Sequence, residues 1–139
     1  MKKTFKFEAG HATCVTVYKH KTFIGEAHCH PDDADFESER VGSYIADIRS
    51  DIEVLKYMRD YELRPAYNCL NHILCSMKRS KLYNEKSYES KFIRRQLHRI
   101  QNQLTAVNNE IATLRLTLKV YIKDKEEFYQ KIRKDKNKQ

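Results

Sequence analysis

The feature that most constrains this chain is a long apolar repeat in its C-terminal part. Large side chains recur from Ile93 to Ile132 at alternating steps of four and three residues, with Lys125 as the charged member. The repeat consists of Ile93, Leu97, Ile100, Leu104, Val107, Ile111, Leu114, Leu118, Tyr121, Lys125, Phe128 and Ile132. A period of about 3.5 residues held over this length is typical of a coiled coil. We therefore predict one long helix over residues 86–133.

A second apolar stripe runs through the middle of the chain. Its members are Val41, Ile45, Ile48, Ile52, Leu55, Leu63, Leu70, Ile73 and Met77. They predict a first helix over residues 36–79, with a kink or break near Arg64, because Pro65 lacks a backbone N–H and clashes with the preceding turn. The segment SKLYNEKS, residues 80–87, separates the two helices. Two helices of similar length joined by a short loop predict a long antiparallel αα-hairpin with coiled-coil character.

The first thirty residues have a different pattern. The segments ATCVTVYK and TFIGEAHC are rich in β-branched and aromatic residues, and Lys19, His20 and Lys21 separate them, which predicts a β-hairpin. The segment TFKF near the start is a candidate third strand. The predicted fold class is mainly α (α+β): an N-terminal β-hairpin or small antiparallel sheet over residues 1–30, followed by the αα-hairpin, in a single domain of residues 1–139.

Composition narrows the environment and the partners of the chain. It holds 27 Lys and Arg against 19 Asp and Glu, a formal net charge of +8 that attracts phosphate groups. No apolar run approaches the roughly 20 residues of a membrane span, and MKKTFKFEAG lacks the apolar core of a signal peptide, so we expect an intracellular protein without a membrane partner. A lone pair of helices would leave further apolar residues uncovered, and these predict a homo-oligomer. They include Tyr57, Met58, Tyr67, Leu116, Val120 and Ile122.

The segment IGEAHCHPDDADFESE, residues 24–39, combines histidines, a cysteine and carboxylates. As a metal site it offers His28 and His30 on one face of a strand, and a third ligand would have to come from Cys14, Asp32, Asp33 or Asp35. The spacing matches no standard zinc motif. Pro31 as a strand stop, Asp35 or Ser38 as a helix cap and the acidic first turn explain more of the segment. We assign no metal ligand here.

Catalysis has little support in the sequence. Cys29 stands between two histidines, but neighbours along a strand point to opposite faces, and no turn presents a nucleophile. No glycine-rich loop cradles a phosphate. We expect no catalytic residue, no cofactor and no enzymatic activity.

The second helix carries an unusual polar row beside its apolar repeat. Arg94, Gln101, Asn108 and Arg115 follow one another at seven-residue steps, where coiled coils usually place Glu and Lys. Arginine and amide groups fit phosphates, riboses and base edges, although they can equally form ordinary hydrogen bonds between helices.

The loop between the helices adds an aromatic ring and an amide, Tyr83 and Asn84. They are surrounded by Lys78, Arg79, Lys81 and Lys86. An aromatic ring among cations suits a stacked base that carries phosphates. In the alternative interpretation Tyr83 closes the end of the hairpin.

The order GEAHCHPDDADFESERVGSYIADIR, then a long helix ending in SMKRSKLYNEKSYESK, then a coiled-coil helix, resembles the phage anti-Thoeris signal-sponge family, Thoeris anti-defence type one. The likeness runs from about Phe5 to Arg133. It implies a phage protein in the host cytoplasm that sequesters a cyclic ADP-ribose isomer and so blocks bacterial Thoeris immunity. It also implies oligomers with ligand pockets between protomers, and some members hold cyclic oligonucleotides at a separate site.

In that family an aromatic ring stacks on the base and arginines meet the phosphates. Tyr83 is the best match for the ring, and Arg59 and Arg115 for the phosphate contacts. Two alternatives stay open: a basic coiled-coil protein that binds nucleic acid, and a phage protein that blocks a host factor through its apolar stripe. Nucleic acid is the weaker partner, because acidic residues such as Asp47, Asp51 and Asp60 interrupt the basic surface.

Overall fold

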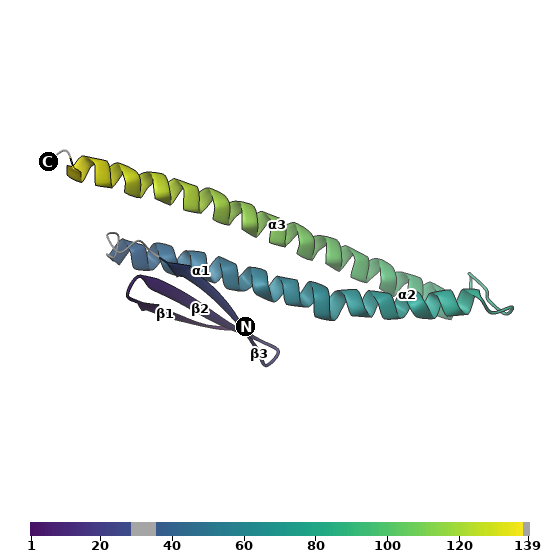
Figure 1. Cartoon of the computed structure of the whole chain (residues 1–139). Coiled ribbons are helices and arrows are strands. Elements are labelled where there is room, and N and C mark those ends of the chain that lie inside the picture. The colour runs from purple at the N-terminus through teal and green to yellow at the C-terminus, as the bar shows by residue number, and fades with distance from the viewer. Residues whose placement is uncertain (29–35, 138–139) are drawn as a thin grey trace. The chain divides into compact units, whose positions relative to one another are not determined.

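The computed structural model describes residues 1–28 and 36–137 and is mainly helical, with a small antiparallel sheet at the N-terminus (Figure 1). The sheet consists of β1 (Lys2–Glu8), β2 (His11–Tyr18) and β3 (Lys21–His28). The helices are α1 (Phe36–Tyr57), the π-helical turn η2 (Met58–Leu63), α2 (Arg64–Lys78) and α3 (Tyr88–Asn137). The predicted fold class is confirmed, with the third strand present; the oligomer stays a prediction.

The chain forms two compact units. The sheet unit comprises Met1–Val54 and Ile111–Gln139, and the helical unit comprises Leu55–Glu110. The assignment of residues 1–139 to a single domain stays a prediction.

The sheet has the strand order β1-β2-β3 with both pairs antiparallel. Two-residue turns join the strands, and all four turn residues have positive φ: Ala9 (52°), Gly10 (78°), Lys19 (48°) and His20 (65°). Two positive φ values in a row give the turn whose twist matches that of paired strands. The turns fix the register, so that His11 pairs with His28 and Cys14 with Gly25.

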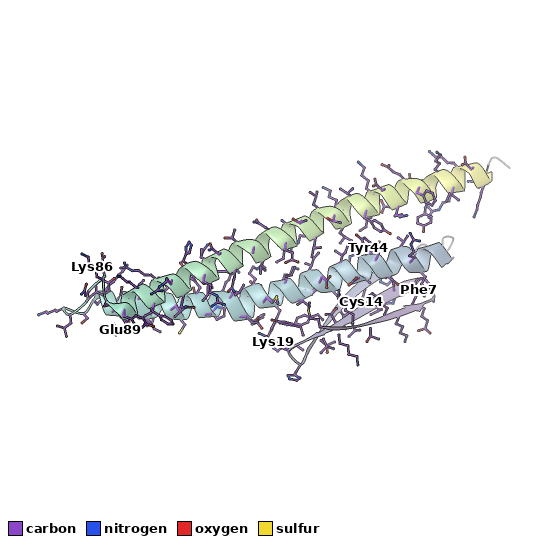
Figure 2. All side chains as sticks on the ribbon, turned by 180° about the vertical axis from the view of Figure 1, so that it is seen from behind. Phe7, Cys14, Lys19, Tyr44, Lys86 and Glu89 are labelled. Atoms are coloured by element: carbon purple, nitrogen blue, oxygen red, sulfur yellow. The ribbon has the colours of Figure 1, made fainter. Side chains whose placement is uncertain are left out.

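One face of the sheet packs on α1 through small side chains. Ala12, Cys14, Ala27 and Ala46 form a fully or nearly fully buried cluster, and Figure 2 shows Cys14 on the side of the sheet toward α1. Gly25 permits the close approach, because a Cβ at this position would lie 2.0 Å from the carbonyl oxygen of Ala46. The small residues of the two elements therefore bring the sheet against the helix backbone.

Polar groups complete this contact. The buried Thr16 and Ser50 hydroxyls are 2.9 Å apart, and Ser50 also donates to the sulfur of Cys14 at 3.3 Å. At the rim, the ammonium group of Lys3 donates to the carboxylates of Asp47 and Asp51.

The same unit contains the C-terminal part of α3. The rings of Tyr44 on α1 and Tyr121 on α3 have centroids 4.5 Å apart, and Ile111 is 2% exposed. Lys125 fits into the apolar repeat because its ammonium nitrogen lies 5.7 Å from the Tyr121 ring and 5.6 Å from the Phe128 ring. Cation–π contacts of this kind stabilise a charge beside aromatic side chains.

In the helical unit, η2 immediately precedes Pro65 in α2. The backbone N–H of Arg64 donates to the carbonyl of Arg59, five residues earlier, instead of to the usual fourth. The wider turn lies directly before Pro65, where the proline ring would clash with an ordinary α-helical turn. The predicted break near Arg64 is thus a continuous π-helical turn, and a bend of the axis stays a prediction.

The helices of the described chain lack membrane-spanning character, since none is both long enough and apolar enough to cross a bilayer.

Candidate functional site

Three of the candidate residues, Tyr83, Asn84 and Arg94, meet where the loop after α2 joins α3. The Tyr83 hydroxyl lies 3.2 Å from the hydroxyl of Ser90, which is fully buried in the first turn of α3. Arg94, one turn further along α3, donates a hydrogen bond from Nη2 to the same Tyr83 oxygen. Its guanidinium carbon is 6.0 Å from the centre of the Tyr83 ring. The ring is therefore anchored at the end of the hairpin.

Asn84 shapes the loop beside it. Its side-chain oxygen accepts a hydrogen bond from the Lys86 N–H at 2.9 Å, and its carbonyl accepts one from the Ser87 N–H at 3.0 Å. A side-chain amide that caps the backbone two residues later forms an Asx turn. The oxygen of this amide thus has a structural role in the loop.

A cavity of about 300 Å³ adjoins this cluster. Its lining is Met77, Ser80, Leu82, Tyr83, Asn84, Ser87 and Glu89. Figure 2 labels Lys86 and Glu89 near the loop that joins α2 to α3. The volume is at the lower end of the range for small-molecule sites, so the cavity suits one ring system rather than a whole dinucleotide.

Electrostatics around Arg94 are mixed. The Glu85 carboxylate lies 3.5 Å from Arg94 Nη2, and the Arg94 side chain is 38% exposed. The side chains of Lys78, Arg79, Lys81 and Lys86 are all exposed. Cations outnumber carboxylates here, so a phosphate near Arg94 would meet a positive surround.

A second cluster contains Arg59 and Asn108. Arg59 donates from Nε and Nη2 to the two carboxylate oxygens of Asp60, at 2.9 and 3.3 Å, and from Nη1 to the side-chain oxygen of Asn108 at 3.4 Å. Arg64 adds a second cation 2.9 Å from Asp60. The hydrogen bond from Arg59 holds the pKa of Asp60 below its ordinary value, and that bond to Asp60 raises the pKa of Arg59.

This second cluster limits what Arg59 can do. Its guanidinium already pairs with a carboxylate, so an incoming phosphate would have to compete with Asp60 for the same donors. Arg64, whose side chain is 55% exposed, is the more accessible cation of the two. Asp60 was not expected as a partner of Arg59, because adjacency in the sequence does not show which side chains fold back on each other.

The other two candidates have different positions. Gln101 is an exposed residue of α3, and its carbonyl accepts a hydrogen bond from the Thr105 hydroxyl at 3.0 Å. Arg115 is exposed on the part of α3 that belongs to the sheet unit. Among the candidate residues, the structure therefore pairs Tyr83 with Arg94 and Arg59 with Asn108 through side-chain hydrogen bonds.

The segment predicted as a strand stop and helix cap falls largely outside the described residues. This holds for Cys29, His30, Pro31, Asp32, Asp33 and Asp35, and the Ser38 side chain is likewise not described. Cys14, which was considered as a metal ligand with His28, is buried between the sheet and α1 instead. His28 lies on the outer face of the sheet, with His11 and Glu26.

The pairing of His28 with His11 was not predicted from the sequence. The signal was present: a two-residue turn at Lys19–His20 pairs residues whose numbers add to 39, and His11 and His28 satisfy that sum. The predicted separation by Lys19, His20 and Lys21 gives a different register, in which His11 and His28 are not directly opposite each other.

The chain matches no family model, no curated protein and no solved structure in comparisons with known proteins. Its function is therefore proposed from its residues, from their geometry and from the resemblance described in the sequence analysis.

Proposed function

We propose that the chain is a phage counter-defence protein that binds and sequesters a cyclic ADP-ribose-type signalling nucleotide in the host cytoplasm, without chemical conversion. The observation that carries this proposal is the anchored Tyr83 ring beside a cavity, with Arg94 hydrogen-bonded to its hydroxyl. The resemblance to the anti-Thoeris signal sponges supplies the ligand class. The geometry supports a site for a flat ring next to phosphate-binding cations.

The second part of the proposal is that the binding site is completed by another copy of the chain. Asn108 lies about 21 Å along α3 from Arg94, because a helix rises about 1.5 Å per residue. One small nucleotide cannot reach both clusters of the same helical unit. A second copy could bring its Arg64 or Arg115 close to the first copy's Tyr83.

Exposed aromatic residues support self-association. Tyr61 and Tyr88 are 72% and 71% exposed, and Tyr88 stacks on Phe92, which is 46% exposed, with centroids 6.3 Å apart. In the sheet unit, Leu116 and Val120 lie one turn apart on α3 and are 64% and 51% exposed. Apolar side chains that gather on one helix stripe are typical of an interface between protein chains.

Sequestration requires tight binding and no reactive group. Arginines can pair with phosphates without leaving an unpaired charge, since the ligand brings the compensating anion. Cyclic oligonucleotides are a further ligand class under this proposal, because they present the same combination of bases and phosphates.

The proposal is tested by calorimetric titration of the protein with cyclic ADP-ribose isomers and cyclic oligonucleotides. We expect one of these to bind and to be recovered intact after the protein is denatured. Arg94→Gln should weaken its binding at least about 10-fold, since a charge-assisted hydrogen bond is lost. Arg95→Gln, an exposed neighbour on the same helix, is the matched control and should bind as the wild type does.

Two results would overturn the proposal. A protein that binds none of the cyclic nucleotides offered is not a signal sponge. A ligand that returns cleaved would instead identify an enzyme.

A further inference from the structure

We propose that the outer face of the sheet holds a divalent transition-metal ion of the zinc class through His11, Glu26 and His28. This site lies in the sheet unit and does not depend on the proposed nucleotide binding. The three residues come from two strands and were not predicted as a set.

Strand register brings the ligands together. His11 on β2 and His28 on β3 are directly paired, so their side chains leave the sheet on the same face. Glu26 precedes His28 by two residues and therefore points to that face as well. The imidazole rings stack with centroids 4.2 Å apart and an angle of 10° between their planes.

The ligand atoms are close enough for one ion. One nitrogen from each histidine and one carboxylate oxygen lie within 4.8 Å of one another. Ligands about 2.1 Å from a tetrahedral ion are about 3.4 Å apart. The difference is within reach of side-chain rotation, because the side chains of His11 and Glu26 are 39% and 54% exposed.

One nitrogen of the proposed ligands, Nε2 of His11, is a buried polar atom. Within residues 1–28 and 36–137, Nε2 of His11 has no hydrogen-bond partner and is shielded from solvent, and it lies 3.8 Å from the Glu26 carboxylate. A polar atom buried without a partner loses its hydration, and a bound metal ion would give Nε2 the partner that it lacks. This atom faces the carboxylate that would share the ion.

The chemistry of the three groups selects the metal. Two imidazoles and one carboxylate suit zinc, nickel or copper better than magnesium or calcium, which prefer oxygen ligands only. Three protein ligands leave a fourth tetrahedral position for water or another molecule.

The surroundings hold the backbone of the proposed site in place. β2 is the central strand, and its other face packs on α1 through Ala12 and Cys14, so the backbone beneath His11 is held from behind. On β1, Glu8 pairs with His11 and adds negative charge near the site. The Lys6 ammonium nitrogen, 3.4 Å from a Glu8 carboxylate oxygen, partly offsets this charge. A hollow of about 700 Å³ beside the site is lined by Glu8, His11 and Thr13, among others.

Equilibrium dialysis with ZnCl₂ tests the proposal. We expect one tightly bound zinc per chain, with at least about 100-fold weaker binding in His11→Gln and His28→Gln, because loss of a supporting group outside the ligand set already costs 10- to 100-fold. Glu26→Gln keeps the shape of the side chain and should also weaken binding. His98→Gln, an exposed histidine on α3, is the control and should leave binding unchanged.

Cobalt(II) distinguishes this site from a cysteine site. Cys69 and Cys75 are exposed, so zinc could bind there instead. At the proposed site cobalt should show visible bands without a thiolate-to-cobalt charge-transfer band. Such a band, equal zinc binding by wild type and by all three variants, or no zinc binding at all would each overturn the proposal.

Discussion

The two units of the molecule are stabilised in different ways. Nine of the ten buried hydrophobic residues identified in the described chain belong to the sheet unit, and Leu74 is the one in the helical unit. The sheet unit excludes water with small side chains packed closely between a sheet and a helix. The helical unit relies more on exposed and half-buried polar contacts, such as those of Asp60 and Tyr83.

This difference fits the proposed roles of the two units. A unit with little buried surface leaves its polar and aromatic groups accessible to a ligand or to another copy of the chain. A unit with a well-packed core can hold side chains at fixed positions on its outer face. Regions with few buried contacts also open more readily. Nucleotide binding should therefore stabilise the helical unit more than the sheet unit.

The largest expected effect comes from Gly25→Ala in the sheet unit. The new Cβ would lie 2.0 Å from the Ala46 oxygen and 2.5 Å from the Ser50 nitrogen, both backbone atoms of α1 that cannot rotate away. We expect a loss of about 3 kcal/mol in the free energy of unfolding, measured in urea. Ile24→Ala, at a neighbouring residue that is 53% exposed, is the control and should cost about 0.5 kcal/mol. Equal costs would show that the sheet does not pack closely on α1.

Leu74→Ala tests how far the helical unit depends on its buried leucine. Leu74 is 6% exposed, and its truncation should cost about 2 to 3 kcal/mol by loss of burial and by cavity formation. Ile73→Ala removes a side chain that is 41% exposed and should cost about 1 kcal/mol or less. Amide hydrogen exchange in residues 64–78 gives the local readout. Equal losses in the free energy of unfolding for the two variants would show that Leu74 is not a core residue of the unit.

The smallest effect concerns the ion pairs at the rim of the sheet unit. Lys3→Met should cost about 1 to 2 kcal/mol, because Asp47 and Asp51 lose a shared, partly buried donor. Lys6→Met is the control, since Lys6 and Glu8 are 76% and 74% exposed and such a pair contributes about 0 to 0.5 kcal/mol.

The same pair predicts a dependence on pH. Burial lowers the pKa of Lys3, but its hydrogen bonds to Asp47 and Asp51 outweigh burial and raise the pKa above the ordinary 10.5. A raised pKa in the folded state stabilises the fold below pH 10.5 and loses that contribution as the pH rises through the folded value. Above pH 10.5 the stability gap between wild type and Lys3→Met should shrink. A constant gap across this range would contradict the proposed linkage.

Much of the fold could be predicted from spacing. The apolar repeat of α3 is buried or half-buried in the structure except at Phe128, because a period of about 3.5 residues places its members on one side of a helix. Strand positions followed from β-branched and aromatic residues. The close approach at Gly25 could not be predicted, since it depends on which helix residues the sheet meets.

The candidate sites could be predicted only in part. Tyr83 and Arg94 are eleven residues apart, within the reach of a loop that leads into a helix, and they do meet. The neutralisation of Arg59 by Asp60 depends on side-chain conformation, which sequence spacing does not specify. The trio of His11, Glu26 and His28 depends on the length of one turn, where an error of a single residue changes every pair.

The π-helical turn η2 keeps the apolar stripe on one side of the helix despite an extra residue in its spacing. From Leu55 to Leu63 the chain advances eight residues, one more than two turns of the repeat require, and yet both side chains are half-buried. The wide turn takes up that surplus residue, so that Tyr67, Leu70 and Leu74 continue with steps of three and four. Deleting one residue between Met58 and Leu63 should therefore restore an uninterrupted ladder of ordinary α-helical hydrogen bonds while keeping the stripe in phase.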